Sequence, residues 1–426
     1  MTELSQPNGA NIRAVVSHPS KQGNMYRVPM GAAACGIPTK FLTGFYYKPG
    51  HFPWGLLALL PKDRRRRIEE KLERRRLREM DPAMVIQVSG PLPELCYGWF
   101  KDYRIGNAIH DRLVVRWLAS HVAAGSAGIF HGFQESCARS LSFARRRGLT
   151  ALLESTLPPS TMPLVSAEYR RLGVAWAGPS QPAAELLDEL ARAQFHVAQS
   201  AFAERSLIEH GVEPGRIFRM PLGVDAERFR PAEGPRPPGP FRALFAGHMS
   251  VRKGVHHLIA GWQAAALPEA ELVFVGVAKD KYILDLVARQ PAGIRYLGFV
   301  PNARLHETYQ SADVFVFPSL AEGGVYVIYE ALACGLPCIV SANAGSAVRD
   351  GIEGFVVPVG DSEAIADRLR RLAEDEPLRR RMAVAARARA ERFAWPEFYR
   401  RIGLMYREAV AREGHAAPAP VDMFER

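Results

Sequence analysis

Short apolar runs alternate with longer stretches of helical spacing along the whole chain. In the first half, β-branched and aromatic residues gather in seven runs of strand length. Strands that are buried on both faces read as continuous apolar runs, so this pattern predicts a parallel sheet covered by helices on each side. The expected strands are Arg13–Ser17, Thr39–Phe45, Met84–Val88, Gly128–His131, Thr150–Glu154, Phe195–Ala198 and Arg216–Met220.

The second half repeats the alternation with cleaner apolar runs. The expected strands there are Arg242–Ala246, Glu271–Val275, Ile294–Leu297, Val314–Phe317, Cys338–Val340 and Phe355–Val357. After Gly360 the pattern turns helical, over Glu363–Glu374 and Leu378–Arg392, and a further helix begins beside Pro396. The fold class is therefore α/β, with two doubly wound parallel sheets.

A run of prolines separates the two halves. Residues 230–240, RPAEGPRPPGP, contain five prolines, which oppose both helix and sheet pairing. This segment predicts a linker and a hinge between two domains. The expected division is a first Rossmann-like domain over 1–229, the linker over 230–240, a second Rossmann-like domain over 241–393, a helix over 394–413 that crosses back to the first domain, and a frayed tail over 414–426.

Composition agrees with an ordinary folded protein of two domains. The 426 residues are 48% hydrophobic and 23% charged, and a single core stops growing near 250–300 residues. The chain has no apolar run of the ~18 residues that a membrane span needs, and its polar start has no signal-peptide pattern, so we expect a cytoplasmic protein. Five cysteines without a C-x-x-C spacing predict buried thiols, no disulfide framework and no metal site.

Positive charge is concentrated in the first half, where residues 1–240 hold 32 Lys and Arg against 22 Asp and Glu. Residues 61–80 hold ten basic and five acidic side chains and follow the apolar segment FPWGLLALLP. An apolar wedge beside a basic helix favours an anionic membrane surface, which residues 52–78 would contact. The alternative is a solvated helix, supported by Glu69, Glu70 and Glu73, which alternate with arginines; Glu69 and Glu70 stand at i,i+4 spacing from them. No nucleic-acid partner is expected, because no binding module accompanies the charge.

Two acids mark the most informative stretch of the second half. Glu322 and Glu330 lie eight residues apart, in a strand, loop, helix pattern over residues 317–345. If the helix begins near Gly324, its first amides form a site for a phosphate. Carboxylates accept hydrogen bonds from vicinal hydroxyls, so each acid suits a sugar ring. The alternative is that Glu330 caps a helix or pairs within the fold.

A second loop brings cations to the same edge of the sheet. In FAGHMSVRKGV, Arg252 and Lys253 precede Gly254 and a helix start. Two cations at the carboxyl end of a strand can neutralise a diphosphate as it leaves. The alternative is a charged surface loop.

Residues 194–393 resemble the retaining nucleotide-sugar glycosyltransferases of family 4, the glycosyl transferases group 1, which have the GT-B fold of two facing Rossmann-like domains. The resemblance implies that Glu322 binds donor-sugar hydroxyls, Glu330 the nucleotide ribose and Lys253 the diphosphate. The matching segments are QSAFAERSLIEHGVEPGRIFRMPLGVDAERFRP, FAGHMSVRKG, IRYLGFVPNARLHETYQSADVFVFPS, the E-x7-E pair, ALACGLPCIVS and GIEGFVVPVGD.

Two departures from the family pattern affect the donor site. Where the family has G-R, this chain has Gly247 and His248, so Arg252 is the expected substitute for the missing phosphate-binding Arg. Where the family has E-G-F-G, this chain reads Glu322, Gly323, Gly324 and Val325, which keeps a glycine loop without its aromatic residue.

The first half resembles the family's acceptor domain more weakly. The resemblance implies that His131, at a strand end, lies beside the reacting sugar, and the alternative is a packed histidine. His18 and Gly23 occupy the place of the family's glycine-rich loop, which faces acceptor and phosphate.

The expected reaction is transfer of a sugar from a nucleotide diphosphate-sugar to an acceptor hydroxyl, with retention at the anomeric carbon and without a metal or cofactor. The expected acceptor is a glycan or a lipid-linked molecule in bacterial-type polysaccharide or glycolipid biosynthesis, at the inner face of the cell membrane. Two alternatives stay open, namely a GT-B nucleotide-sugar epimerase and a non-catalytic GT-B protein that binds nucleotide sugar or a partner.

Overall fold

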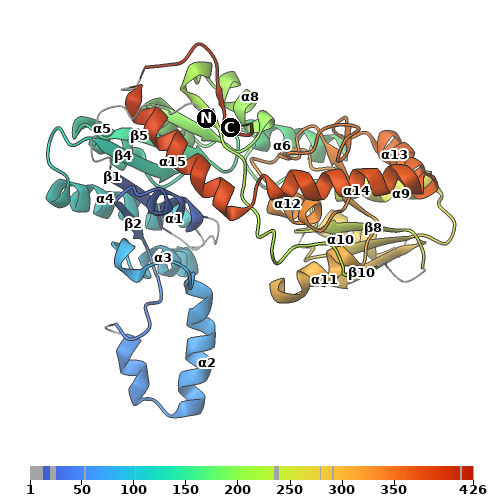
Figure 1. The fold of residues 1–426 in the computed structure, drawn as a ribbon, viewed down its shortest axis with the longest axis horizontal. Helices are drawn as coiled ribbons and strands as arrows, with labels where there is room; N and C mark the ends of the chain where they lie inside the picture. The colour runs from blue at the N-terminus through green and yellow to red at the C-terminus, as the bar shows by residue number, and fades with distance from the viewer. Residues whose placement is uncertain are drawn as a thin grey trace.

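The computed structural model describes residues 13–19, 25–51, 54–100, 102–234, 239–278, 280–289, 292–412 and 415–425. The chain forms two domains side by side, each an α/β layer structure (Figure 1). The first domain holds an eight-stranded sheet in the order β14-β7-β6-β5-β4-β1-β2-β3, with parallel pairing throughout. Its strands are β1 (Arg13–His18), β2 (Thr39–Thr43), β3 (Val85–Gln87), β4 (Gly128–Phe133), β5 (Thr150–Ser155), β6 (Phe195–Ala198), β7 (Ile217–Arg219) and β14 (Val421–Asp422).

The second domain holds a six-stranded parallel sheet in the order β10-β9-β8-β11-β12-β13. Its strands are β8 (Arg242–Ala246), β9 (Glu271–Val275), β10 (Ile294–Gly298), β11 (Val314–Phe317), β12 (Cys338–Ser341) and β13 (Gly354–Val357). In both sheets the chain starts near the centre, runs to one edge and then returns to the other side. This is the doubly wound arrangement, so the predicted fold class is confirmed.

Helices cover both faces of each sheet, and most strands are apolar and buried, although the edge strand β10 is largely exposed. The helices of the first domain are α1 (Arg27–Ala34), α2 (Lys62–Leu72), α3 (Leu92–Phe100), α4 (Tyr103–His121), α5 (Ala138–Arg146), α6 (Thr161–Arg171), α7 (Ala184–Arg192) and α8 (Ala201–Glu209). Those that follow are α9 (Val255–Ala265), α10 (Lys281–Ala288), α11 (Leu305–Gln310), α12 (Tyr326–Ala333), α13 (Ser362–Glu374), α14 (Glu376–Glu391) and α15 (Trp395–Ala411).

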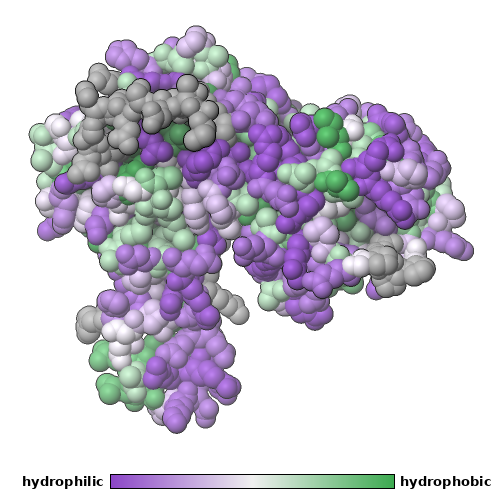
Figure 2. Space-filling view, in the orientation of Figure 1, coloured by the Kyte–Doolittle hydropathy of each residue, from purple (hydrophilic) through white to green (hydrophobic). Residues whose placement is uncertain are grey.

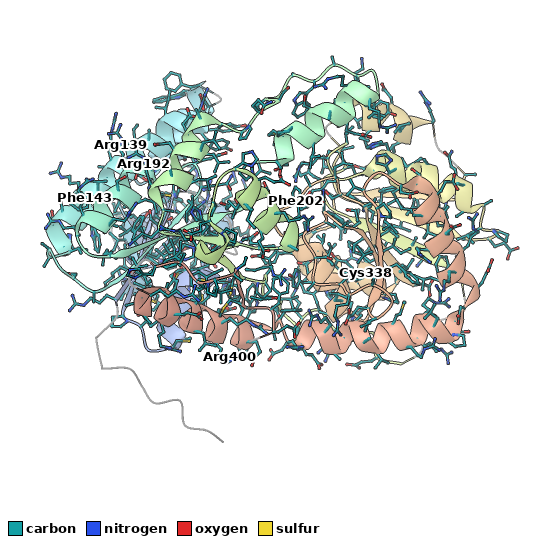
Figure 3. The ribbon with its side chains drawn as sticks, turned by 90° about the horizontal axis from the view of Figure 1, so that it is seen from above. Arg139, Phe143, Arg192, Phe202, Cys338 and Arg400 are labelled. Carbon is teal, nitrogen blue, oxygen red and sulfur yellow. The ribbon has the colours of Figure 1, made fainter. Side chains whose placement is uncertain are left out.

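The last helix returns to the first domain, where α15 packs against α1 and β4. Figure 3 shows α14 and α15 along one edge of the molecule, with Arg400 on the outer side of α15 and Cys338 inside the second domain. Cys338 is one of four buried free thiols, with Cys96, Cys137 and Cys334, whereas Cys35 is half-buried. The described cysteines therefore form no disulfide.

The chain crosses between the domains before the proline run, not within it. Val224 lies in the apolar core of the second domain, and its amide donates to the carbonyl of Phe393 (2.8 Å). Val224 also forms a bridge with Ala394, so the outward and return crossings lie side by side. Arg387 on α14 donates to the carbonyl of Phe229 (3.0 Å). The crossing between the domains therefore lies before the predicted linker at 230–240, of which residues 235–238 lie outside the described chain.

Residues 415–425, in the tail after α15, contact the rest of the chain, which differs from the frayed tail predicted over 414–426. Val421 and Asp422 form β14, which extends the first sheet beside β7. Met423 is fully buried, and Glu425 pairs with Arg389 (3.1 Å) on α14. Alanine and proline favoured a loose end in the sequence, but three apolar side chains, Val421, Met423 and Phe424, fasten it to both domains.

A narrow projection extends from the first domain, and Figure 1 shows it standing clear of the rest of the molecule. We call residues 54–72 the arm; it consists of a 3₁₀ turn, η1 (Trp54–Leu59), and the helix α2. Trp54 fixes one end of the arm by packing edge-on against Phe45 (ring centroids 5.0 Å apart) and Tyr47 (5.8 Å). The amide of Tyr47 donates to the carbonyl of Arg75 (3.0 Å), which fixes the other end.

Candidate active site

The predicted donor residues lie at the switch point of the second sheet. The loop with Arg252 and Lys253 follows β8, and the loop with Glu322 follows β11. These two strands are neighbours, and the strand order reverses between them. Ligands of open α/β sheets bind outside the carboxyl ends of strands at such a point. The topology therefore brings together two motifs that are about 70 residues apart in the sequence.

Both cations converge on one carboxylate. The Nη1 atom of Arg252 and the Nζ atom of Lys253 each lie 2.7 Å from Oε1 of Glu322. The hydroxyl of Ser319 donates to the same oxygen (2.8 Å). Glu322 is only 5% exposed, so this carboxylate is held in one orientation by three donors. Two cations therefore lie at the carboxyl end of the second sheet, where the carboxylate of Glu322 balances part of their charge.

Burial shapes the charge of Lys253. The buried ammonium lies 5.0 Å from the ring centroid of Phe317, at the end of β11. Burial lowers the pKa of Lys253, and nearby Arg252 lowers it further, whereas Glu322 opposes the shift. A bound dianion would act in the same direction as Glu322 and keep the ammonium protonated.

The glycines after Glu322 allow the two domains to touch. A Cβ atom on Gly323 would lie 2.3 Å from the carbonyl oxygen of Thr156, which follows β5 in the first domain. A Cβ atom on Gly324 would lie 2.9 Å from the side chain of Gln199, at the end of β6. Gly324 stands where the family has an aromatic residue, and the backbones of the two domains approach each other closely at this loop.

A cavity of about 290 Å³ lies between the domains at this contact. From the second domain it is lined by Arg252, Glu322, Gly324 and Tyr326. From the first domain, Met25, Val28, Phe133, Glu154, Thr156, Leu157, Gln199, Met220, Pro221 and Leu222 line it, together with Phe398 and Ile402 of α15.

Glu330 lies apart from this cavity. Helix α12 begins at Tyr326, so Gly324 precedes the helix and Glu330 lies in its second turn. Oε2 of Glu330 accepts a hydrogen bond from the hydroxyl of Tyr309 (2.9 Å). Burial raises the pKa of Glu330 to about 7, against the opposing effects of Tyr309 and Arg228. This carboxyl group is therefore poised to change charge near neutral pH, and its predicted ribose contact stays a prediction.

His131 does not line either cavity at this cleft, and its predicted contact with the sugar stays a prediction. Strand β4 continues to Phe133, so His131 lies inside the sheet with no exposed surface. Its Nδ1 atom lies 2.8 Å from the hydroxyl of Tyr406 and its Nε2 atom 3.1 Å from Glu154. Strand β4 is thus two residues longer than predicted, and His131 has the packed position that the alternative interpretation describes.

Glu154 is the functional candidate that the sequence analysis missed. It lies near the end of β5, lines the cavity and accepts a hydrogen bond from Nε2 of Gln199 (2.6 Å). Nε2 of His131 lies 3.1 Å from the other carboxylate oxygen, Oε2. The sequence could have indicated this role, because Glu154 is an acid at the carboxyl end of the predicted buried strand TALLES.

Of the remaining predicted residues, one is exposed, two are buried and one lies outside the described residues. His248 is exposed and follows Gly247 at the end of β8. His18 ends β1, is buried, and packs edge-on against Phe133 (5.3 Å). Gly23 lies outside the described residues. Val325 is buried and caps the N-terminus of α12.

A second cavity, of about 750 Å³, adjoins the first and shares Met25, Phe133, Thr156 and Leu157 with it. Its walls come from the carboxyl ends of β1 and β4, which flank the switch point of the first sheet, and from α2, α3 and α4. The residues that line only this second cavity are His18, Pro19, Lys71, Arg75, Glu94, Tyr103, Asn107, Gln134, Glu135 and Ser136. The two cavities place the switch points of both sheets on one continuous cleft.

One group of side chains in the described chain has the size of a metal site. Oε1 of Glu168 on α6 lies 2.7 Å from Nε2 of His256 and 3.0 Å from Nε2 of His257 on α9. Arg171 donates to the same carboxylate oxygen (2.7 Å), which opposes a cation there. Burial lowers the pKa of His256 to about 4, and the pKa of Glu168 falls to about 2 because its partners outweigh the opposing effect of burial. The group therefore acts as a hydrogen-bonded tie between the domains.

Two facing Rossmann-like domains with a cleft at both switch points define the GT-B class of proteins. Residues 227–389 match the family model described as glycosyl transferases group 1, so the predicted family is confirmed over that range.

Curated proteins with similar sequences are named as glycosyltransferases or mannosyltransferases. The chain is 31% identical over 274 residues to "D-inositol 3-phosphate glycosyltransferase" of Streptomyces bingchenggensis, which covers 57% of this chain and 60% of the relative. It is 31% identical over 160 residues to "O-antigen chain mannosyltransferase B" of Escherichia coli, covering 36% of this chain and 42% of that protein. The chain spans about three fifths of the length of the first curated relatives it matches.

Solved structures share the fold along nearly the whole chain. Sucrose-phosphate synthase from Thermosynechococcus elongatus superposes with a TM-score of 0.63 at 19% identity, covering 94% of this chain and 99% of the other. The Anabaena protein HepE, in complex with UDP and glucose, gives a TM-score of 0.59 at 15% identity, with coverage of 94% and 99%. At these identities the likeness shows the fold alone.

Proposed function

We propose that this protein is a glycosyltransferase that moves a sugar from a nucleotide diphosphate-sugar to an acceptor hydroxyl. The observation that carries the proposal is the convergence of Arg252 and Lys253 on Glu322 at the switch point of the second sheet. Cations suit the diphosphate, and a buried carboxylate suits sugar hydroxyls. The names of the curated relatives support this class of reaction.

On donor binding, Arg252 and Lys253 would turn from Glu322 to the diphosphate oxygens. Glu322, released from its counter-charges, would accept hydrogen bonds from the hydroxyls of the donor sugar. As the sugar departs, negative charge grows on the diphosphate, and the two cations stabilise that charge in a site with little water. These roles support a metal-independent reaction, because two side chains supply the positive charge that a metal would otherwise supply.

Retention at the anomeric carbon is part of the proposal. A front-face reaction needs the acceptor hydroxyl on the same side of the sugar as the leaving diphosphate. The second cavity adjoins the first, which supports such an approach, and Glu154, which lines the first cavity, would face the sugar from the other domain. Contact between Gly323 and Thr156 would exclude water and protect the donor from hydrolysis.

We also propose that the acceptor is a glycan or a lipid-linked molecule in polysaccharide or glycolipid biosynthesis, and that the protein works as a peripheral protein at the inner face of the cell membrane. Among the described residues, no helix has the length and apolar character needed to cross a bilayer. The excess of basic residues in the first half supports an anionic partner on that side of the cleft.

The test is turnover with the donor sugar followed by NMR at the anomeric carbon, for the wild type and for Glu322→Gln. The proposal predicts a product that keeps the donor's anomeric configuration, full activity in EDTA, and at least a hundredfold loss of turnover in Glu322→Gln. Inversion would contradict the proposed stereochemistry. Interconversion of donor sugars without transfer would favour the epimerase, and donor binding without any turnover would favour the non-catalytic alternative.

A further inference from the structure

The arm presents an apolar tip that nothing in the described chain covers. None of the residues of η1 is buried, and Leu56 and Leu59 are 54% and 82% exposed. Figure 2 shows a green, apolar patch on one side of the projection near its free end, beside a purple, hydrophilic surface. Exposed leucines at the end of a protruding segment are unfavourable in water unless they insert into an apolar medium.

The helix beside this tip carries unpaired positive charge. No residue of α2 is buried. Arg65 pairs with Glu69 (2.9 Å) and Arg66 approaches Glu70 (3.6 Å), as i,i+4 spacing predicts. No ion pair joins Lys62, Arg64 or Arg67 to another described side chain, although all three are exposed. The solvated-helix interpretation explains the paired arginines, but it leaves the remaining cations and the leucine tip unexplained.

The root of the arm forms one wall of the second cavity. Lys71, in the last turn of α2, and Arg75 line it. Helix α2 has 11 residues, so the cavity lies about 16 Å from the arm's tip. Trp99 and Phe100, at the end of α3, are also exposed (76% and 59%). Figure 1 shows α3 at the root of the arm.

The side chains that line the second cavity suit a ligand that has both hydroxyl groups and negative charge. Oε1 of Glu94 accepts a hydrogen bond from Nη1 of Arg75 (2.6 Å), whereas its Oε2 atom is buried without any hydrogen-bond partner. A buried carboxylate oxygen without a partner is unfavourable, and a ligand hydroxyl would satisfy it. Lys71 forms no ion pair with a described acidic side chain, so it can supply a cation for a phosphate.

We propose that the arm seats this protein on an anionic lipid bilayer, with Leu56 and Leu59 inserted and the free cations of α2 on the headgroups. The second cavity then receives the anionic, hydroxyl-bearing headgroup of a lipid anchored in that bilayer. The second half of this inference rests on the proposed function, because it names the acceptor class of the same reaction. The arrangement brings a lipid-linked acceptor to the cleft without removing its tail from the membrane.

The first experiment is co-sedimentation with vesicles of phosphatidylcholine, with and without phosphatidylglycerol, at low and high salt. Wild type should bind the anionic vesicles, and binding should fall at least tenfold in Leu56→Ser with Leu59→Ser and in Arg64→Glu with Arg67→Glu. Charge-matched and apolar controls lie on α14, where Val384 is 74% exposed. Arg380→Glu with Arg381→Glu, and Val384→Ser, should bind as the wild type does.

Three results would overturn the membrane assignment: no binding by wild type, equal loss in the α14 controls, or unchanged binding after the leucine substitutions. Unchanged vesicle binding by the leucine variant, with heparin competing fully, would assign the arginines to a soluble polyanion instead. Thermal unfolding of each variant checks that the arm changes leave the two domains folded.

The second experiment separates the cavity from the bilayer by using glycerophosphoinositol, the free headgroup of phosphatidylinositol, as the probe. Glu94→Gln and Lys71→Glu should weaken its binding about tenfold, whereas the leucine variant should bind it as the wild type does. No binding of this headgroup by wild type would overturn the cavity assignment. Donor binding is measured separately, so loss of headgroup binding with intact donor binding refutes this inference and leaves the proposed transferase standing.

Discussion

At the scale of single residues, the sequence predicted site residues well where a motif combines a characteristic spacing with side chains of suitable chemistry. Glu322, Lys253 and Arg252 were predicted as a group, and the structure brings them into direct contact. The sequence was uninformative where burial decides the role. His131 has the chemistry of a ligand contact, but the strand continues past it, and Glu154 at the next strand's end reaches the cavity instead.

Glu330 predicts a pH dependence of donor binding. Burial raises the pKa of this carboxyl group to about 7, so it becomes ionised in the folded protein as pH rises through neutrality. An ionised carboxylate is the better acceptor for ribose hydroxyls, so donor affinity should rise by up to about tenfold between pH 6 and pH 8. Calorimetry across this range measures the effect. Glu330→Gln should flatten the profile, and an equally steep profile in that variant would contradict the assignment.

The close approach of Gly323 to Thr156 predicts that a larger side chain at position 323 hinders closure of the two domains. A methyl group at this position would overlap the carbonyl oxygen of Thr156, 2.3 Å away, so Gly323→Ala should hold the domains apart. We expect turnover to fall at least tenfold while the melting temperature changes by only a few degrees. Gly98→Ala is the matched control, because a Cβ atom there meets nothing within 4 Å. Normal turnover in Gly323→Ala would show that closure does not depend on this contact.

At the scale of elements, periodicity predicted the strands well. Four strands, such as β8 and β11, have the bounds expected from the sequence. The exceptions share a physical cause, because each depends on a partner far away in the chain. β14 is two residues long and exists because β7 offers a free edge. The proline run looked like a linker, but the crossing lies at Val224 and Ala394, where two distant segments pair.

The tail predicts a measurable loss of stability. Met423 is fully buried between elements of the first domain, so Met423→Ala leaves a cavity that should cost about 2–4 kcal/mol. Chemical denaturation of the variant measures this free energy of unfolding. His415→Ala, in the exposed part of the same tail, is the control. Equal midpoints for Met423→Ala and wild type would mean that the tail frays after all.

The hydrogen-bonded group of Glu168, His256 and His257, which joins α6 to α9, predicts that the protein loses stability in acid. The pKa of His256 is lowered to about 4 in the folded protein, so the unfolded chain binds more protons between pH 6.5 and 4. The lowered pKa of Glu168, about 2, acts in the same direction below pH 4.5. Stability is therefore lost as pH falls. His256→Asn should reduce the slope of unfolding free energy against pH by up to about 1.4 kcal/mol per pH unit. An unchanged slope in that variant would contradict the role given to this histidine.

At the scale of the whole molecule, two sheets present their switch points to one cleft. The sequence predicted this architecture because each half has its own apolar alternation and the second half has spaced motifs. The returning helix was also predicted, but the close contact between the domains was not, since it depends on glycines whose small size permits it. The arm was visible as apolar and basic segments, but only its projection from the domain shows that both are free for a partner.

The most direct measurement of the central claim is calorimetric donor binding by wild type and Lys253→Met, against UDP-, GDP-, ADP- and dTDP-sugars with and without EDTA. Our account predicts one saturable donor class, no effect of EDTA, and at least tenfold weaker binding in Lys253→Met, with Lys281→Met as the matched control on α10. Binding of no donor by the wild type, or equal binding by Lys253→Met, would contradict it.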